Sequence, residues 1–157
     1  MNNKINIRVG AESDLPQILN LIKELATYEK APAEVEVTLG EMQNWGFGKD
    51  KLFDFFVAEE NNSIFGLALY YYKYSTWKGK CMFLEDIIVT ESQRGRGIGK
   101  LLFDEVVKIG KQKKVRSLEW QVLDWNEPAI KFYKKYNSVM DDEWINCKLT
   151  GHQMKLF

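Results

Sequence analysis

The most constraining feature of this sequence is a set of three consecutive strand-like runs in the middle of the chain, at residues 52–60, 63–74 and 80–90. They read LFDFFVAEE, SIFGLALYYYKY and KCMFLEDIIVT, and they are rich in the β-branched and aromatic residues that favour strands. Only Asn61 and Asn62 separate the first two runs, and such a pair is a short turn signal. The spacing predicts an antiparallel hairpin, with a third strand joined to it through STWKG.

Helical and strand-like segments lie on both sides of these three runs. Apolar residues recur at helical spacing after the first strand and again after the third run, and short polar segments separate the elements. The predicted order is a strand (5–9), a helix (13–29), a short helix (38–45), the three strands, a helix (98–109), a strand (116–123), a helix (126–137) and one or two closing strands in 138–157. This order predicts an α+β fold with a mixed central sheet flanked by helices.

Length and composition indicate an ordinary globular protein. The chain has 157 residues, of which 45% are hydrophobic and 28% charged, which predicts one domain over residues 1–157. No run approaches the roughly 18 apolar residues that cross a membrane, and the first residues, MNNKINIRVG, contain no apolar signal core. We therefore expect no membrane partner and a cytoplasmic location. His152 is the single histidine, and no Cys/His spacing suggests a metal site.

The charges are unevenly distributed, although the net charge is zero. Residues 1–60 contain 6 Lys/Arg against 11 Asp/Glu, whereas residues 94–135 contain 11 Lys/Arg against 5 Asp/Glu. Such a division suits a protein that binds an anion with one half and a cation with the other. A nucleic-acid partner is not expected, because the overall charge has no basic bias.

A glycine-rich stretch, QRGRGIGK at 93–100, follows the third strand-like run and begins a predicted helix. The first amides of a helix lack intrahelical partners, the helix dipole is positive there, and glycines let a ligand approach the backbone closely. The stretch therefore predicts a phosphate site. The dinucleotide pattern fails because it would need glycine at Lys100, and no Walker-type pattern is present. The alternative is that the glycines only shape a tight turn.

The stretch VTESQRGRGIGKLL resembles the R-x-x-G-x-G/A pyrophosphate motif of the GNAT superfamily of N-acetyltransferases, with Arg94, Gly97 and Gly99 at the motif positions. The segments LIKELATYE, WGFG, LYYYKYSTWKGK, FLEDIIV and WNEPAIKFYKKY resemble its spermidine/spermine (diamine) and thialysine acetyltransferase branch. This resemblance spans about residues 5–148. The chain departs from the pattern at its short Asn61-Asn62 turn and at Asn137, where a glycine is usual.

The resemblance implies an acetyl-CoA-dependent enzyme with the GNAT fold, in which two splayed strands hold acetyl-CoA. The pantetheine arm would run along the strand at 87–89, and the pyrophosphate would lie on the backbone amides of 95–100. The side chain of Asn126 would serve either this ligand or the cap of the following helix. The residues implied in acetyl-CoA binding are Ile87, Ile88, Val89, Arg94, Gly95, Arg96, Gly97, Ile98, Gly99, Lys100 and Asn126.

Acetyl transfer to an amine calls for a base and an acid. An alkylammonium with a pKa of about 10 must lose a proton before it attacks a thioester, and the leaving thiolate benefits from receiving one. By resemblance, Glu85 is the base, acting through water, and Tyr133 is the acid. Strand alternation sends Glu85 and Asp86 to opposite faces unless a bulge intervenes. The alternatives are a solvent-facing carboxylate for Glu85 and core packing for Tyr133.

The predicted acceptor is a small cationic amine, for which carboxylates and aromatic faces are suitable partners. The candidate substrate-binding residues are Tyr28, Glu29, Trp77, Glu85 and Asp86. A polyamine or diamine is the leading acceptor. The alternatives are a thialysine-like amino acid, a peptide or protein amine, and a CoA-binding module without catalysis. A homodimer is expected from the family's pairing through C-terminal strands and from the apolar tail EWINCKLTGHQMKLF.

Overall fold

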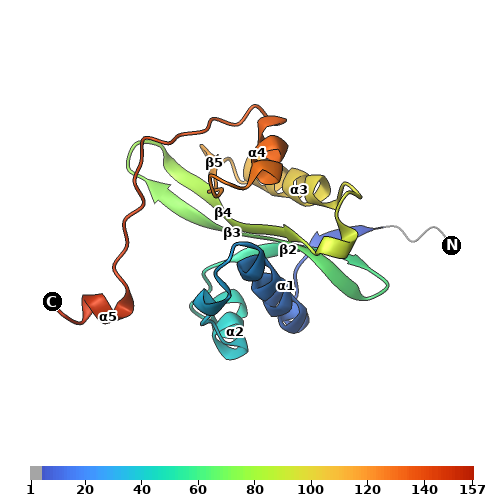
Figure 1. Ribbon diagram of the computed structural model, residues 1–157, viewed down its shortest axis with the longest axis horizontal. Coiled ribbons are helices and arrows are strands. Elements are labelled where there is room, and N and C mark those ends of the chain that lie inside the picture. The colour runs from blue at the N-terminus through green and yellow to red at the C-terminus, as the bar shows by residue number, and fades with distance from the viewer. Residues whose placement is uncertain (1–4) are drawn as a thin grey trace. The chain divides into compact units, whose positions relative to one another are not determined.

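The computed structural model describes residues 5–157, which fall into two compact units, one ending at Gln121 and the other running from Val122 to Phe157. The first unit contains a five-stranded sheet with the strand order β1-β2-β3-β4-β5 (Figure 1). The strands are β1 (Asn6–Val9), β2 (Asp54–Glu60), β3 (Ser63–Ser75), β4 (Gly79–Val89) and β5 (Leu118–Glu119). The first four pair antiparallel and β4 pairs with β5 in parallel, so the predicted mixed sheet is confirmed.

The hairpin between β2 and β3 forms at the predicted turn. Asn61 and Asn62 have φ values of 52° and 63°, and Glu60 lies opposite Ser63. Two consecutive left-handed residues give the turn the twist that antiparallel strands require, and asparagine tolerates that conformation better than most residues. The local sequence therefore sets the register of the sheet's central hairpin.

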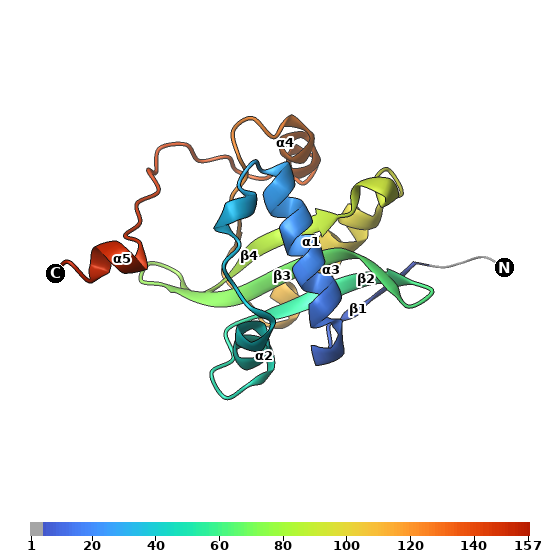
Figure 2. The ribbon, with the colours of Figure 1, turned by 60° about the horizontal axis from the view of Figure 1, so that its bottom comes forward.

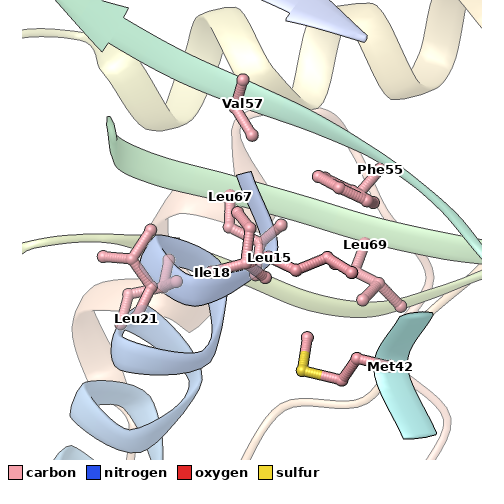
Figure 3. Close-up of a cluster of buried hydrophobic side chains, with 9 residues drawn as sticks. Leu15, Ile18, Leu21, Met42, Phe55, Val57, Leu67 and Leu69 are labelled. Atoms are coloured by element: carbon pink, nitrogen blue, oxygen red, sulfur yellow. The ribbon is translucent and has the colours of Figure 1, made fainter. Parts of the chain in front are cut away.

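Helices cover both faces of the sheet in this unit. Figure 2 shows α1 (Leu15–Tyr28) crossing one face, with α2 (Leu39–Phe47) beside it, and α3 (Ile98–Gln112) lies on the other face. The main core forms between α1, α2 and alternate residues of the strands (Figure 3). Its buried members are Leu15, Ile18, Leu21, Met42, Phe55, Val57, Leu67, Leu69 and Ile88. The same face of the sheet continues beyond this core, where it carries polar groups.

The second unit contains α4 (Glu127–Lys134) and the four-residue helix α5 (Gly151–Met154). Asn126 is the N-cap of α4, one of the two roles expected for it, and its side chain accepts a hydrogen bond from the amide of Ala129 at 3.4 Å. Asn137 has a φ of 54°, the left-handed conformation expected where glycine is usual.

Two strand predictions in the C-terminal part of the chain need correction. The strand expected over 116–123 is reduced to Leu118–Glu119, because an edge strand persists only where β4 offers it hydrogen bonds. The closing strands predicted in 138–157 are wrong, since the described chain has no strand there. Thr150 and Gln153 instead exchange hydrogen bonds in a capping box, which favours a helical turn.

Candidate active site

A β-bulge in β4 brings two neighbouring carboxylates to one face of the sheet. Asp86 lies opposite Leu69 and Leu84 lies opposite Tyr70, so Glu85 is an extra residue in β4. Leu69 belongs to the core beneath α1, and Tyr71, two residues further on, lies on the same face. The Tyr71 hydroxyl donates a hydrogen bond to Oε2 of Glu85 at 3.1 Å. Both carboxylates therefore face the α1 side, and the bulge overrides the expected alternation.

The two carboxylates form an acidic cluster with Glu29, which follows the last turn of α1. Asp86 is partly buried, and its pKa is raised to about 6 by desolvation first and then by the negative charges of Glu85 and Glu29. Burial also raises the pKa of Glu29. A bound cation would relieve the repulsion among these carboxylates, and so would an amine that gives a proton to one of them. Three of the predicted substrate-binding residues are thus brought together.

The perturbed carboxyl of Asp86 leads to a prediction about stability. In the folded protein its pKa is about 6 against 3.8 for an ordinary aspartate, so its ionisation opposes folding above pH 6 and not below about 4. We expect Asp86→Asn to raise the free energy of unfolding by about 1–3 kcal/mol at pH 8 and to change it little at pH 3.5. Urea unfolding of both proteins at the two pH values measures this. A gain of equal size at both pH values would contradict the electrostatic explanation.

Beyond the bulge, β4 and β5 diverge. In the described part of the chain they pair only at Met82 with Leu118 and Phe83 with Glu119. Ile87, Ile88 and Val89 pair with β3 on their other side, and Ile88 is buried in the core. Their backbone edge on the β5 side therefore extends past the paired residues, and an extended ligand with amide groups could bind along it. This arrangement agrees with the splayed strands expected from the sequence.

The glycine-rich stretch forms a left-handed turn at the start of α3. Gly95 and Gly97 have φ values of 79° and 78°, and Gly97 is the N-cap of α3 without a side-chain cap. A Cβ atom at either glycine would meet nothing within 4 Å, so the requirement for glycine is conformational and not steric. The first intrahelical bond runs from the amide of Leu101 to the carbonyl of Gly97. The amides of the first turn before Leu101 thus have no intrahelical partners and lie at the positive end of the helix dipole, an arrangement that favours an anion.

The basic side chains of this stretch have partners within the chain. Nε of Arg94 donates to the carbonyl of Val89 at 2.9 Å, and its guanidinium lies 5.0 Å from the ring centroid of Tyr28. Arg96 forms an ion pair with Glu60 at 3.1 Å, and Lys100 forms one with Asp104 at 2.5 Å. Because these side chains already have partners, an anion at this loop would first meet the backbone amides. Tyr28, predicted to bind substrate, contacts the glycine-rich loop through Arg94.

An open pocket of about 440 Å³ lies between α1 and the segment that follows β4. It is lined by Lys23, Glu24, Thr27, Tyr28, Glu91 and Arg94. Glu24 accepts hydrogen bonds from the Thr90 hydroxyl at 2.6 Å and from the Glu91 amide at 2.9 Å, which attaches the loop to α1. Neither Glu24 nor Tyr71 was predicted from the sequence. No local signal marks them, because their roles depend on residues 14 to 67 positions away.

The remaining predicted residues lie elsewhere. Trp77 is at the tip of the β3–β4 turn with 86% of its surface exposed, eight positions from Glu85, and the chain does not bring it to the acidic cluster. In the second unit, Tyr133 lies in α4, is 5% exposed and has its ring 5.2 Å from that of Phe132.

The described residues contain no group of three or more His, Cys, Asp or Glu side chains placed to bind a metal. No helix within 5–157 has the length and apolar character needed to cross a membrane.

Comparison with known proteins agrees with this geometry. A thialysine N-epsilon-acetyltransferase from Mus musculus is 32% identical over 160 residues, which cover 95% of this chain and 94% of the relative. A human spermidine/spermine N(1)-acetyltransferase-like protein is 34% identical over 134 residues, or 81% of this chain and 19% of that protein. The solved structure of an integron cassette protein from the V. cholerae mobile metagenome shares the fold, with a TM-score of 0.79 at 21% identity over 97% of this chain and 96% of its own. The family model described as Acetyltransferase (GNAT) family matches residues 15–137. The family expected from the sequence is thereby confirmed, and the chain belongs to the GNAT acetyltransferase family.

Proposed function

We propose that this protein transfers the acetyl group of acetyl-CoA to a primary amine at the end of a small cationic molecule. The observation that carries the proposal is the cluster of Glu29, Glu85 and Asp86 at the bulge of β4, the strand that leads into the glycine-rich loop. A polyamine or diamine is the leading acceptor, since several carboxylates suit several ammonium groups. A thialysine-like amino acid is the second candidate, supported by the name of the mouse relative.

The residues present fit acetyl-CoA. The left-handed glycines and the uncapped N-terminus of α3 would hold its pyrophosphate, and the exposed edge of Ile87 to Val89 would hold its pantetheine arm. When bound, acetyl-CoA supplies an acetyl thioester activated for transfer. Arg94, Arg96 and Lys100 are charged groups at the same loop, where they would add to the positive potential. In the proposal Asn126 serves α4 as its cap.

The carboxylates and Tyr133 have separate roles in the proposed reaction. The amine nitrogen forms a bond to the acetyl carbon, the bond from that carbon to sulfur breaks, and the ammonium proton leaves. Glu85 takes up this proton through water, and the raised pKa of Asp86 makes it the second candidate for the same role. The phenol of Tyr133 supplies the proton that the departing sulfur needs. The nitrogen loses a second proton once it has bonded to the acetyl carbon, and this proton restores the phenol of Tyr133. The net reaction converts an ammonium and acetyl-CoA into an acetamide, the CoA thiol and one proton, so atoms and charges balance and no further reactant is required.

The proposal is tested by measuring CoA release from acetyl-CoA with the purified protein and a panel of amines. The panel contains putrescine, spermidine, thialysine, ornithine and a peptide with a free N-terminal amine. Turnover with the small amines, accompanied by a product heavier by one acetyl group in mass spectrometry, would support the proposal. Binding of CoA without turnover of any amine would show instead a CoA-binding module. Turnover of the peptide alone would move the acceptor to the protein class.

The glycine loop gives a prediction about acetyl-CoA affinity. Valine at position 97 would have to adopt a φ of 78°, which is strained for a β-branched residue, so we expect the loop to rearrange. Gly97→Val should weaken CoA binding by about 10-fold or more, as measured by calorimetry. Gly79→Val is the matched control, because Gly79 has a φ of 83° and open surroundings but lies in the β3–β4 turn. Unchanged affinity in Gly97→Val would remove this loop from the CoA site.

We also propose that the protein is a homodimer. The C-terminal tail exposes large apolar side chains, with Trp144 at 75%, Ile145 at 86% and Phe157 at 100%, and such a concentration on one segment suits burial against a second copy. Sedimentation velocity at micromolar concentration should give a dimer, and Ile145→Glu should shift it toward monomer. Leu52→Glu is the control, since Leu52 is also exposed but lies outside the tail. A wild-type protein that sediments only as a monomer would contradict this proposal.

A further inference from the structure

A continuous strip of side chains leads from the acidic cluster along the α1 face of the sheet. At one end, Tyr71 donates its hydrogen bond to Glu85, and its ring lies 5.5 Å from the ring of Phe83. Nζ of Lys73 lies 5.7 Å from the centroid of Phe83. At the other end, Lys73 forms an ion pair with Glu119 of β5 at 2.6 Å. The strip therefore joins a carboxylate, two aromatic rings and a mixed-charge pair, all within the first unit.

The register of the sheet explains why these groups share a face. Tyr71 pairs with Phe83, Lys73 is two residues beyond Tyr71 in β3, and Glu119 pairs with Phe83 from the β5 side. Side chains two residues apart on a strand point to the same side and are about 7 Å apart. Lys73 is thus one side-chain repeat beyond Tyr71, measured along the strand away from the acidic cluster.

The Lys73–Glu119 pair contributes little to the stability of the fold. Its side chains are 38% and 40% exposed, and a pair of this kind contributes about 0–1 kcal/mol to folding. Ser117 donates to Oε1 of Glu119 at 2.7 Å, and the hydrogen bonds from Lys73 and then from Ser117 hold the pKa of Glu119 below its usual range. An ammonium has three donors and a carboxylate about four acceptor positions, so the pair can bind further charged groups while staying paired.

We propose that the Lys73–Glu119 pair binds the α-carboxylate and α-ammonium of an amino acid whose side-chain amine lies at Glu85 and Asp86. This inference rests on the proposed acetyl transfer, and it moves the amino-acid class of acceptor, the second candidate above, ahead of the diamine class. Lys73 would face the α-carboxylate, and Glu119 would face the α-ammonium. The pair is complementary to a zwitterion because it offers one charge of each sign at a fixed separation.

Chain length supports the assignment. The extended side chain of lysine, ornithine or thialysine places its terminal nitrogen about 5–6 Å from Cα, as follows from standard bond lengths. Asp86 lies opposite Leu69, two side-chain repeats or about 14 Å along β3 from Lys73. The carboxylate beyond Cα and a hydrogen bond of about 3 Å at each end extend the reach of such a ligand to about this distance. The rings of Tyr71 and Phe83 lie between the two ends and offer an apolar floor to the methylene groups. A diamine of equal length lacks the carboxylate and would leave Lys73 facing a second cation or water.

The test uses acceptors that differ only in the α-carboxylate. Ornithine and putrescine form one such pair, and lysine and cadaverine form another. At saturating acetyl-CoA, we expect wild-type kcat/KM to favour the amino acid of each pair. Lys73→Met should lower kcat/KM for ornithine by about 10–100-fold, the worth of one hydrogen bond between charged groups, and should leave putrescine unchanged or improved. Lys73→Arg should retain the preference.

Lys80→Met is the matched control, because it removes the same charge from an exposed lysine. Nζ of Lys80 lies 4.4 Å from the ring of Tyr72, which precedes Lys73 in β3 and faces the opposite side of the sheet. The control should keep the wild-type preference. Ornithine carboxamide provides a test without any substitution, since a neutral amide replaces its α-carboxylate while both amines remain. It should react with wild-type protein no better than putrescine does. An equal loss for both members of each pair in Lys73→Met, or a carboxamide as good as ornithine, would overturn the inference.

Failure of this inference is distinguishable from failure of the proposed function. If wild-type protein acetylates putrescine and ornithine equally and Lys73→Met leaves that ratio unchanged, acetyl transfer stands and the head-group site is wrong. If wild-type protein acetylates no amine, the transfer proposal is wrong. Calorimetry of ornithine with the CoA-loaded protein then decides the head-group site by itself. Binding that is lost in Lys73→Met and kept in Lys80→Met would uphold it, and absence of binding would overturn it.

Discussion

Replacing Tyr133 by phenylalanine is expected to lower the turnover of acetyl-CoA with the best amine by about 10²–10⁴-fold and to leave CoA affinity nearly unchanged. The substitution keeps the ring, which is buried and lies beside Phe132, and removes only the hydroxyl that would protonate the leaving sulfur. Steady-state turnover and calorimetry of CoA on the same preparations measure the two quantities.

Tyr136→Phe is the matched control for this experiment. The ring of Tyr136 lies 5.5 Å from that of Phe132, so this substitution also removes one phenol oxygen near Phe132. The Tyr136→Phe variant should retain turnover. Near-normal turnover in Tyr133→Phe would favour the packing interpretation of this residue and would require another acid. A loss of turnover that merely follows a loss of thermal stability would also argue against the catalytic role.

Glu85→Gln is expected to reduce turnover by a similar factor at neutral pH, but its defect should diminish as pH rises. Without the base, deprotonation of the amine is left to solvent, and the fraction of neutral amine increases tenfold per pH unit until its pKa of about 10 is approached. The Tyr133→Phe defect should show no such recovery, because its cause lies on the leaving-group side. The measurement is a pH–rate profile of each variant at saturating acetyl-CoA.

Asp86→Asn separates the two carboxylates in this experiment. The pKa of Asp86 is about 6, so a wild-type rate that depends on its ionised form should decline as pH falls through 6. Loss of this acidic limb in Asp86→Asn together with rescue of that variant at high pH would assign the base to Asp86. If Glu85→Gln shows no recovery at high pH, Glu85 is at most an electrostatic anchor for the amine.

The parts of this fold that the sequence predicts correctly are those set by local chemistry. Asn61 and Asn62 define a turn by themselves, Asn126 caps the helix that follows it, and the glycine-rich stretch turns the chain into α3. The structure also brings Glu29, Glu85 and Asp86 together, whereas their binding of a cation stays a prediction. Each of these predictions depends on residues within a few positions of one another, or on a family motif.

The features that escaped prediction depend on register between strands. The bulge at Glu85 exists only relative to β3, and neither the Tyr71 contact nor the Lys73–Glu119 pair has a local sequence signal. The closing strands failed for the same reason, because a strand needs an adjacent edge with which to pair, and composition alone does not supply one. Sequence patterns thus identify the elements and the charged groups, whereas the assembled sheet decides which of them meet.

The bulge has a consequence for how the family can change in evolution. The extra residue shifts the alternation of side chains along β4 by one position. Phe83 and Asp86, which a regular strand would point to opposite sides, therefore face the same side. Insertion of one residue in the turn around Trp77 would leave this alternation in β4 unchanged. Insertion of one residue between Leu84 and Ile88 would shift the alternation again, so that Phe83 and Ile88 would no longer face the same α1 side of the sheet. Length variation among relatives should therefore be found in the turn and be absent from the five residues around the bulge.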